Sequence, residues 1–194
     1  MKLAKQLGIA TAGITLCFTA ISAKPAEAAF VGAYEPANWT LVNTEADGLV
    51  NISDSPEQIQ LFSANNGSGE PGTTDYLVKA VTAGAVNFTW NYSTDDDYAL
   101  YDRFSFVNNG DITDIFSDIV RTGQGTYTTT VAGGDVFGLR LDTRDNIGGR
   151  GNVTISNFNA PVPVPEPSTF GGLLLACGFG LWIKRKQAVS QKAS

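Results

Sequence analysis

Hydrophobic and polar residues alternate with a period of two along the middle of the chain. Residues 86–92 place Val86, Phe88, Trp90 and Tyr92 at every second position, and polar residues fill the gaps. Residues 137–141 repeat the pattern, and residues 127–131 and 153–155 show it more weakly. Side chains on a strand point alternately to its two faces, so each run predicts a β-strand with one buried and one solvent-facing side.

Shorter apolar runs predict further strands earlier in the chain. They cover Trp39–Val42, Leu49–Ile52, Gln58–Phe62 and Tyr76–Val81. Asn109-Gly110 favours a tight hairpin turn, because both residues accept left-handed backbone conformations. This turn would join Phe104–Val107 to Ile112–Phe116, with a helical turn over Ile112–Ile119 as the alternative for the second arm.

Clusters of Gly, Asn, Asp and Ser separate these runs, for example at residues 65–72, 94–97, 132–135 and 146–151. Such residues break helices and supply turns. Many short, half-buried strands with turns between them indicate a mainly β protein. We therefore predict one antiparallel β-sandwich of jelly-roll type over residues 29–160. No repeat of fixed period is present, which argues against a propeller or a solenoid.

The N-terminal segment has the layout of a secretory signal peptide. Lys2 and Lys5 precede the apolar stretch Leu7–Ile21. Ala26 and Ala28 then form a small-x-small site before Ala29. We expect signal peptidase to remove residues 1–28, with a permanent N-terminal anchor as the alternative.

The C-terminal segment carries a second composite signal. Pro161, Pro163 and Pro165 form a stiff linker that leads into the hexapeptide Val164, Pro165, Glu166, Pro167, Ser168 and Thr169. Residues 170–183 are apolar, and the basic cluster Lys184, Arg185 and Lys186 precedes the tail 187–194. Fourteen residues make a helix of about 21 Å, short of the ~30 Å hydrocarbon core. We predict a marginal transmembrane helix with a cytoplasmic tail, because basic residues favour that side.

The order of the proline motif, the apolar stretch and the basic cluster over residues 161–186 resembles the PEP-CTERM sorting signal of Gram-negative bacteria. The resemblance implies recognition of Pro165-Glu166-Pro167 by an exosortase-type membrane protease. It also implies a transient inner-membrane anchor, followed by release to the cell surface, the outer membrane or the extracellular space. The body of the chain looks like ectodomains common among such proteins, which are associated with exopolysaccharide and biofilm.

The predicted ectodomain is acidic and lacks cysteine. Residues 29–163 hold 17 acidic and 6 basic residues, a balance of −11. Such a surface repels nucleic acid and acidic polymers, so no nucleic-acid partner is expected. Cys17 and Cys177 lie in the two terminal segments. The domain is therefore expected to be stable by packing, without disulfides.

The chain contains no histidine. This excludes Ser-His-Asp triads, Cys-His dyads and histidine-ligated metals, and it leaves carboxylate chemistry. Asp95, Asp96, Asp97 and Asp102 could present hard oxygen ligands to calcium, and no other cofactor is predicted. The alternative is a solvated acidic turn, since the spacing differs from an EF-hand loop. Asp142, Asp145 and Asn146 are a second, weaker candidate, because the same residue types are favoured in turns.

Three functions compete on these observations. The leading hypothesis is a non-enzymatic exported surface or matrix protein, linked to exopolysaccharide through the sorting signal. The second is a lectin-like module that binds carbohydrate or calcium, with Trp39 and Trp90 as candidate sugar contacts. Trp90 lies on the apolar face of its run and is predicted to belong to the core. The third is a glycan hydrolase with paired carboxylates, which would need two acids about 5–10 Å apart in one cleft.

Overall fold

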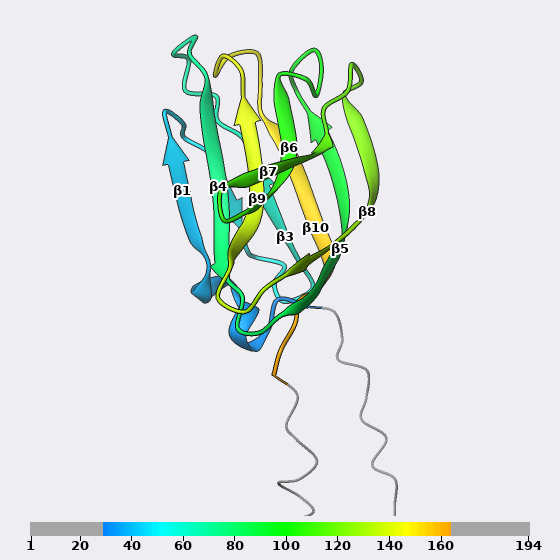
Figure 1. The fold of residues 1–194 in the computed structure, drawn as a ribbon. Coiled ribbons are helices and arrows are strands. Elements are labelled where there is room, and N and C mark those ends of the chain that lie inside the picture. The colour runs from blue at the N-terminus through cyan, green and yellow to red at the C-terminus, as the bar shows by residue number, and fades with distance from the viewer. Residues whose placement is uncertain (1–28, 164–194) are drawn as a thin grey trace, which may run out of the picture.

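The computed structural model describes residues 29–163, which form ten β-strands and two short 3-10 helices (Figure 1). The helices are η1 (Gly32–Tyr34) and η2 (Pro36–Asn38). The strands are β1 (Thr40–Thr44), β2 (Leu49–Asn51), β3 (Gln58–Phe62), β4 (Gly72–Lys79), β5 (Gly84–Thr94), β6 (Asp102–Asn108), β7 (Asp111–Phe116), β8 (Thr122–Val131), β9 (Val136–Thr143) and β10 (Gly151–Asn159). The predicted signal peptide, PEP motif, apolar stretch and basic cluster lie outside the described residues.

The strands form two five-stranded antiparallel sheets that face each other (Figure 1). Sheet A has the order β1-β4-β9-β6-β7, and sheet B has the order β2-β3-β10-β5-β8. From β3 to β10 the chain follows the strand order of a jelly roll, with β1 and β2 added at one edge of each sheet. The mainly β, antiparallel sandwich predicted from the sequence is therefore confirmed. Within residues 29–163, no helix has the length and apolar character needed to cross a bilayer.

Each of the alternating or apolar runs between residues 39 and 155 contains or overlaps a strand, and several strands begin before their runs, β8 by five residues and β4 by four. In β4 the cause can be traced. This strand begins at Gly72, four residues before the predicted Tyr76. Polar Thr73, Thr74 and Asp75 extend the pairing with β9, where they oppose Asp142, Leu141 and Arg140. Cross-strand partners thus lengthened a strand beyond its apolar run. This long-range effect has no signal in the local pattern.

The hairpin predicted at Asn109-Gly110 is present, and the helical alternative over Ile112–Ile119 is wrong. Both turn residues have positive φ, 50° and 90°, as a type I′ turn requires. Strand β7 pairs with β6 from Asn108↔Asp111 onward. Residues 111–114 are exposed and residues 115–116 are half-buried, and the pairing with β6 contains a bulge, as in an edge strand.

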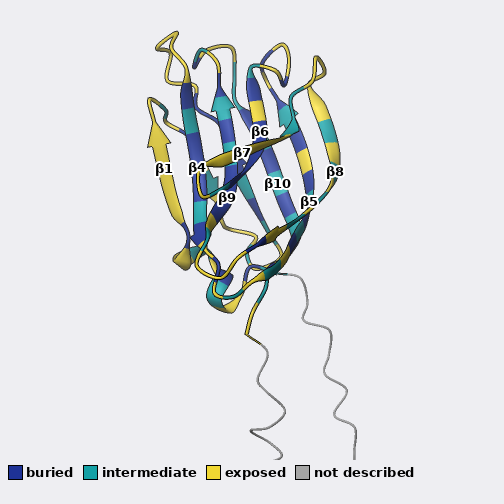
Figure 2. Ribbon diagram, viewed as in Figure 1, coloured by how far each residue is buried: buried dark blue, intermediate teal, exposed yellow. Residues whose placement is uncertain are grey.

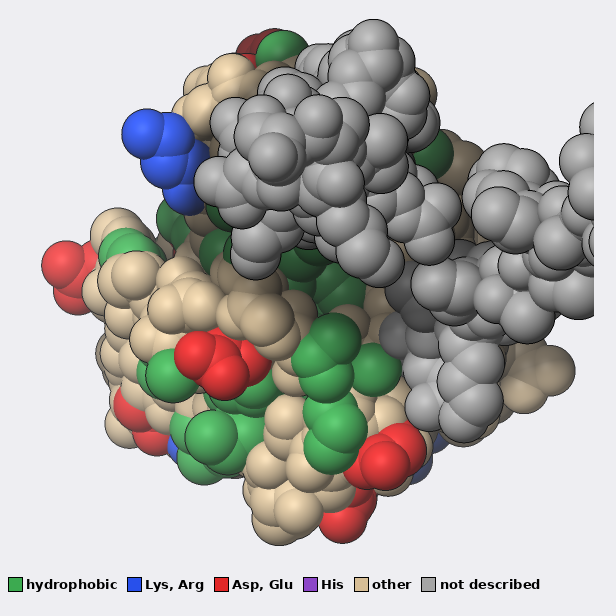
Figure 3. Space-filling view, turned by 90° about the horizontal axis from the view of Figure 1, so that it is seen from below, with side chains coloured by type: hydrophobic (Ala, Val, Ile, Leu, Met, Phe, Trp, Pro, Cys, Tyr) green, Lys and Arg blue, Asp and Glu red, His purple; other side chains and the backbone are tan. Residues whose placement is uncertain are grey.

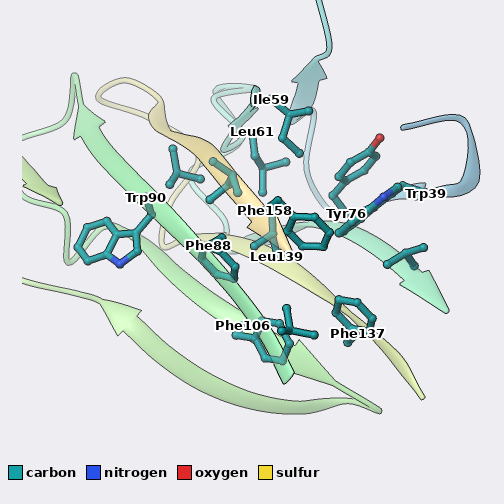
Figure 4. Close-up of a cluster of buried hydrophobic side chains, with 14 of the residues drawn as sticks. Trp39, Ile59, Leu61, Tyr76, Phe88, Trp90, Phe106, Phe137, Leu139 and Phe158 are labelled. Atoms are coloured by element: carbon teal, nitrogen blue, oxygen red, sulfur yellow. The ribbon is translucent and has the colours of Figure 1, made fainter. Parts of the chain in front are cut away.

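The core lies between the two sheets and consists of the inward-facing half of each alternating run (Figures 2 and 4). Sheet A contributes Phe104, Phe106, Phe137, Leu139 and Leu141, all less than 4 % exposed. Sheet B contributes Ile59, Leu61, Val86, Phe88, Trp90, Tyr92, Val153 and Ile155. Trp90 is 7 % exposed, so its predicted place in the core is confirmed. The pairs Trp90↔Ile155 and Tyr92↔Val153 stack apolar side chains across neighbouring strands.

The segment before β1 closes the end of the sandwich where the described chain begins and ends (Figure 1), and hydrophobic side chains are visible on this end of the domain (Figure 3). Phe30 stacks on Phe158 with ring centroids 4.6 Å apart. Trp39 stacks on Tyr76 at 4.9 Å, and its indole nitrogen donates to the carbonyl of Tyr34 at 3.0 Å. Trp39 is 7 % exposed. It therefore belongs to the core, and the structure gives it no role as a sugar platform.

Candidate functional site

The outer faces of the two sheets have different chemistry. Four of the five strands of sheet A carry charged residues, of which Asp75 and Asp102 are buried: Asp75, Lys79, Asp102, Arg103, Asp111, Asp114, Arg140 and Asp142. None of the five strands of sheet B contains a charged residue. Since residues 29–163 hold 23 charged residues, this absence is a distinct property of the sheet rather than of the composition. Sheet B thus presents a neutral face on an acidic domain.

A shallow groove of about 800 Å³ runs over this neutral face. Its lining comes from four adjacent strands: Gln58 of β3, Thr154 and Ser156 of β10, Thr89, Trp90 and Asn91 of β5, and Gln124, Gly125 and Thr126 of β8. Apart from Trp90 and Gly125, these residues are the outward half of the alternating runs, whose inward half forms the core. The lining contains no carboxylate. Apart from the almost fully buried Trp90, the groove therefore offers only hydroxyls, amides and backbone.

Several amide groups of this face are held by hydrogen bonds between strands. The amide of Asn152 donates to Ser93 Oγ at 2.8 Å. The amide of Gln60 donates to Thr154 Oγ1 at 3.2 Å. Such cross-strand bonds fix the rotamers of the donors and reduce the conformational entropy that a ligand would have to remove. The floor of the face is therefore organised before anything binds.

Asn91 and Gln124 differ from these amides. They oppose each other directly in the β5–β8 register, and both are exposed. Neither side chain makes a hydrogen bond to another residue in the part of the chain that the structure describes. Each amide has two donor hydrogens and an acceptor oxygen. The side of the groove nearest the β8 edge thus carries two adjacent amides that are free to bind a ligand.

The alternating pattern predicts these polar positions on the solvent side of their strands but does not identify them as a site. The alternation shows that residues 87, 89 and 91 share a face, and the same holds for residues 124 and 126. It does not show that β3, β10, β5 and β8 lie side by side, because β3 and β10 are about 90 residues apart. The signal available in the sequence was the lack of charge in five separate runs.

A second, smaller hollow of about 490 Å³ lies at the end of sheet A away from the termini. It is lined by Tyr101, Arg103, Asp142 and Arg144, with Glu45 at its side. The guanidinium of Arg144 lies 5.4 Å from the centre of the Tyr101 ring. Arg103 approaches Asp142 at 3.8 Å and Asp114 at 4.0 Å. Two arginines and two acids thus compensate one another here, and Asp142 is held in an ion pair.

The four aspartates predicted as calcium ligands have separate environments. Asp102 is 1 % exposed and accepts hydrogen bonds from Ser63 Oγ at 2.7 Å and from Thr94 Oγ1 at 3.0 Å. Burial raises the pKa of Asp102 to about 6, against the opposing effect of these two hydroxyls. The residue connects β6 to the end of β5 and to the loop after β3. Asp102 therefore holds these three segments together and has a structural role.

Asp96 and Asp97 lie in the turn after β5. Asp96 is buried, and its pKa is raised chiefly by desolvation. Asp97 is exposed and pairs with Arg121 at 3.0 Å. Asp95 is exposed beside it. Among residues 29–163, no group of three or more acidic side chains is arranged to hold a metal ion. Calcium binding by Asp95, Asp96, Asp97 and Asp102 stays a prediction of the sequence.

The weaker candidate around Asn146 is also a structural element. Asn146 is fully buried with a φ of 56°. Its amide donates to the carbonyls of Glu45 at 2.9 Å and Glu70 at 2.7 Å. It therefore joins three loops that are distant in sequence, while Asp142 faces the outer side of sheet A. The structure does not bring these residues together as a ligand set.

Comparisons with known proteins show no relative in sequence: no family model and no curated protein matches the chain. Solved structures match weakly. A secreted serine protease, VesC, from Vibrio cholerae matches with a TM-score of 0.35 and 16% identity, over 53% of this chain and 21% of that protein. A family 35 carbohydrate binding module from Clostridium thermocellum matches at 0.32 and 12%, over 60% and 96%. The N-terminal cellulose-binding domain of Cellulomonas fimi β-1,4-glucanase C matches at 0.37 and 12%, over 66% and 92%.

Proposed function

We propose that this protein is a non-enzymatic exported module that binds a neutral polysaccharide chain on the outer face of sheet B. The observation that carries the proposal is the neutral groove with its free amides Asn91 and Gln124. Sugar hydroxyls both donate and accept hydrogen bonds, as do amide and threonine side chains. The groove lies across four strands, which suits a chain better than a compact small molecule.

The net charge of the domain and the lack of basic residues in the groove favour a neutral ligand. With a balance of −11 over residues 29–163, the domain repels an anionic polymer at long range. The groove has no arginine or lysine that would offset this repulsion. The groove-lining aromatic residue, Trp90, is almost fully buried. Binding would therefore depend on hydrogen bonds, and we expect a modest affinity that changes little with salt.

The second part of the proposal is that export and proteolytic processing bring the protein to the polysaccharide. The PEP-CTERM-like segment 161–186 would hold the module at the membrane until an exosortase-type protease acts near Pro165-Glu166-Pro167. Signal peptidase would already have removed residues 1–28. Mass spectrometry of the termini of the protein from its host tests this route. We expect an N-terminus at Ala29 and a C-terminus near Pro165, whereas an intact, uncut chain would contradict it.

Removal of the two free amides tests the binding function. Replacing both Asn91 and Gln124 with alanine removes two hydrogen-bonding groups worth about 0.5–1.5 kcal/mol each. We expect binding to weaken by about 10–100-fold. Affinity electrophoresis in gels that contain dextran or mannan, as neutral polymers, or alginate, as an anionic one, measures the retardation of the wild type and the variants.

The control variant is Asn51→Ala. Asn51 is an exposed amide of the same sheet, but it lies on β2 at the opposite edge and does not line the groove. We expect this variant to be retarded like the wild type. Absence of retardation by all three polymers, or equal retardation of the double variant, would contradict the proposal. Preference for alginate would contradict the assignment of a neutral ligand.

A further inference from the structure

Strand β8 is the open edge of sheet B, and it lacks the features that normally protect an edge. It pairs with β5 through ten consecutive residue pairs, from Gly84↔Val131 to Ser93↔Thr122, without a bulge. No charged residue or proline occurs between Thr122 and Val131. Figure 2 shows its outer side exposed along the margin of the sandwich. Long, flat, uncharged edges are templates for pairing with another strand.

The other three edge strands are protected. Strand β7 carries Asp111 and Asp114 and has a bulge in its pairing with β6. Strand β2 is only three residues long, and β1 is five residues long. Charge, bulges and short length are the usual means of preventing edge-to-edge association. Within the described domain, β8 alone combines length, regularity and neutrality.

The hydrogen bonds at the end of the β5–β8 ladder show which backbone groups of β8 point outward. The Thr94 amide donates to the Arg121 carbonyl at 2.9 Å, so residues 94 and 121 face each other in a hydrogen-bonded pair. Such pairs alternate along an antiparallel ladder. The odd-numbered residues of β8 therefore bond to β5. The even-numbered residues, Thr122, Gln124, Thr126, Thr128 and Thr130, direct their N–H and C=O groups to the open edge.

We infer that β8 pairs antiparallel with β8 of a second copy of this chain, about a two-fold axis at Thr126. This register places Thr126 opposite its own counterpart, Gln124 opposite Thr128, and Thr122 opposite Thr130. All five outward-directed residues then exchange hydrogen bonds, about ten in total. An isologous contact of this kind closes on itself and produces a dimer rather than an open polymer.

The charge distribution favours this edge as the place where two copies of the chain meet. Two domains with a balance of −11 repel each other over most of their surfaces. Sheet B has no charged residue in any strand, so contact at the β8 edge brings no charged strand residue of this sheet against its counterpart. The contact would join two sheets into a continuous ten-stranded sheet. At the even positions the paired side chains would be threonine with threonine and glutamine with threonine, which are favourable cross-strand neighbours, and the odd positions would pair Gly123 with Thr129 and Gly125 with Tyr127.

Disulfide trapping tests the register. In the full chain with Cys17→Ser and Cys177→Ser, purified in detergent, a single Thr126→Cys substitution places two thiols opposite each other. Their Cα atoms would be about 5.5 Å apart, within the range for a disulfide. Thr130→Cys is the matched control on the same strand, where the proposed register separates the two thiols by about 27 Å. Non-reducing gels after mild oxidation measure the covalent dimer.

We expect the Thr126→Cys chain to form a dimer at least ten times faster than the Thr130→Cys chain. Equal rates, or no dimer from Thr126→Cys, would overturn the inference. Sedimentation velocity provides a second measurement. Thr126→Lys puts like charges at the axis and should give monomers, while Thr154→Lys on central strand β10 should leave the dimer intact. A dimer that persists in Thr126→Lys would overturn the inference too, and neither experiment requires a polysaccharide.

Discussion

Replacement of Gly138 with alanine is expected to unfold the sandwich or to lower its free energy of unfolding by about 3 kcal/mol or more. Gly138 lies in the middle of β9, between Leu77 of β4 and Val107 of β6. A Cβ atom at this position would overlap the backbone carbonyl oxygen of Tyr76 and approach the Cα of Leu77 to 3.0 Å. Both obstacles are backbone atoms of a neighbouring strand, so no change of rotamer can relieve the contact.

Urea denaturation followed by tryptophan fluorescence measures this effect. Gly133→Ala is the matched control, because Gly133 precedes the same strand and its added Cβ would meet Thr82 only at ordinary contact distance, 3.4 Å. We expect the control to unfold within about 0.5 kcal/mol of the wild type. An equal, small effect of both substitutions would show that β4 and β9 can separate without loss of the core, contrary to this packing.

The second large effect concerns the pH dependence of stability. Burial raises the pKa of Asp102 to about 6 in the folded protein, against a reference value of 3.8. The protonated carboxyl therefore favours the folded state, and this contribution is complete below pH 3.8. It is lost as pH rises through 6, and by pH 7 the loss is about 3 kcal/mol. Asp102→Asn keeps a neutral side chain of the same shape at every pH, so this loss should disappear.

The measurement is the free energy of unfolding of the wild type and of Asp102→Asn between pH 4 and pH 7.5. The difference between the two curves isolates the contribution of Asp102, because the remaining acidic residues are common to both chains. We expect the variant to gain stability relative to the wild type as pH rises, mostly between pH 4 and pH 6, the interval between the unfolded and folded pKa values of Asp102. Glu57→Gln, which neutralises an exposed carboxylate, serves as the control for the loss of one charge. Parallel curves for the wild type and Asp102→Asn would disprove the raised pKa.

The outcome of each prediction depended on whether the interactions behind it are local or long-range in sequence. Strand β3 begins and ends where the apolar run does, and the Asn109-Gly110 turn joins β6 to β7. Both depend on interactions between residues close in sequence. Asp102 was grouped with Asp95, Asp96 and Asp97 because it lies near them in the chain. The fold instead buries it against Ser63 and Thr94. Nearness in sequence was a poor guide to the environment of a carboxylate.

By itself, the sequence determined that the domain is built of half-buried antiparallel strands, since a period of two places alternate side chains on opposite faces. It also determined the acidic charge and the lack of histidine and cysteine chemistry in residues 29–163. Only the tertiary structure decided which strands are neighbours. Pairing of β3 with β10 and of β5 with β8 gathers neutral residues from distant segments into one groove and leaves β8 as an open edge. An alternating pattern specifies the face of each side chain but not the adjacent strand, and the adjacent strands make the site.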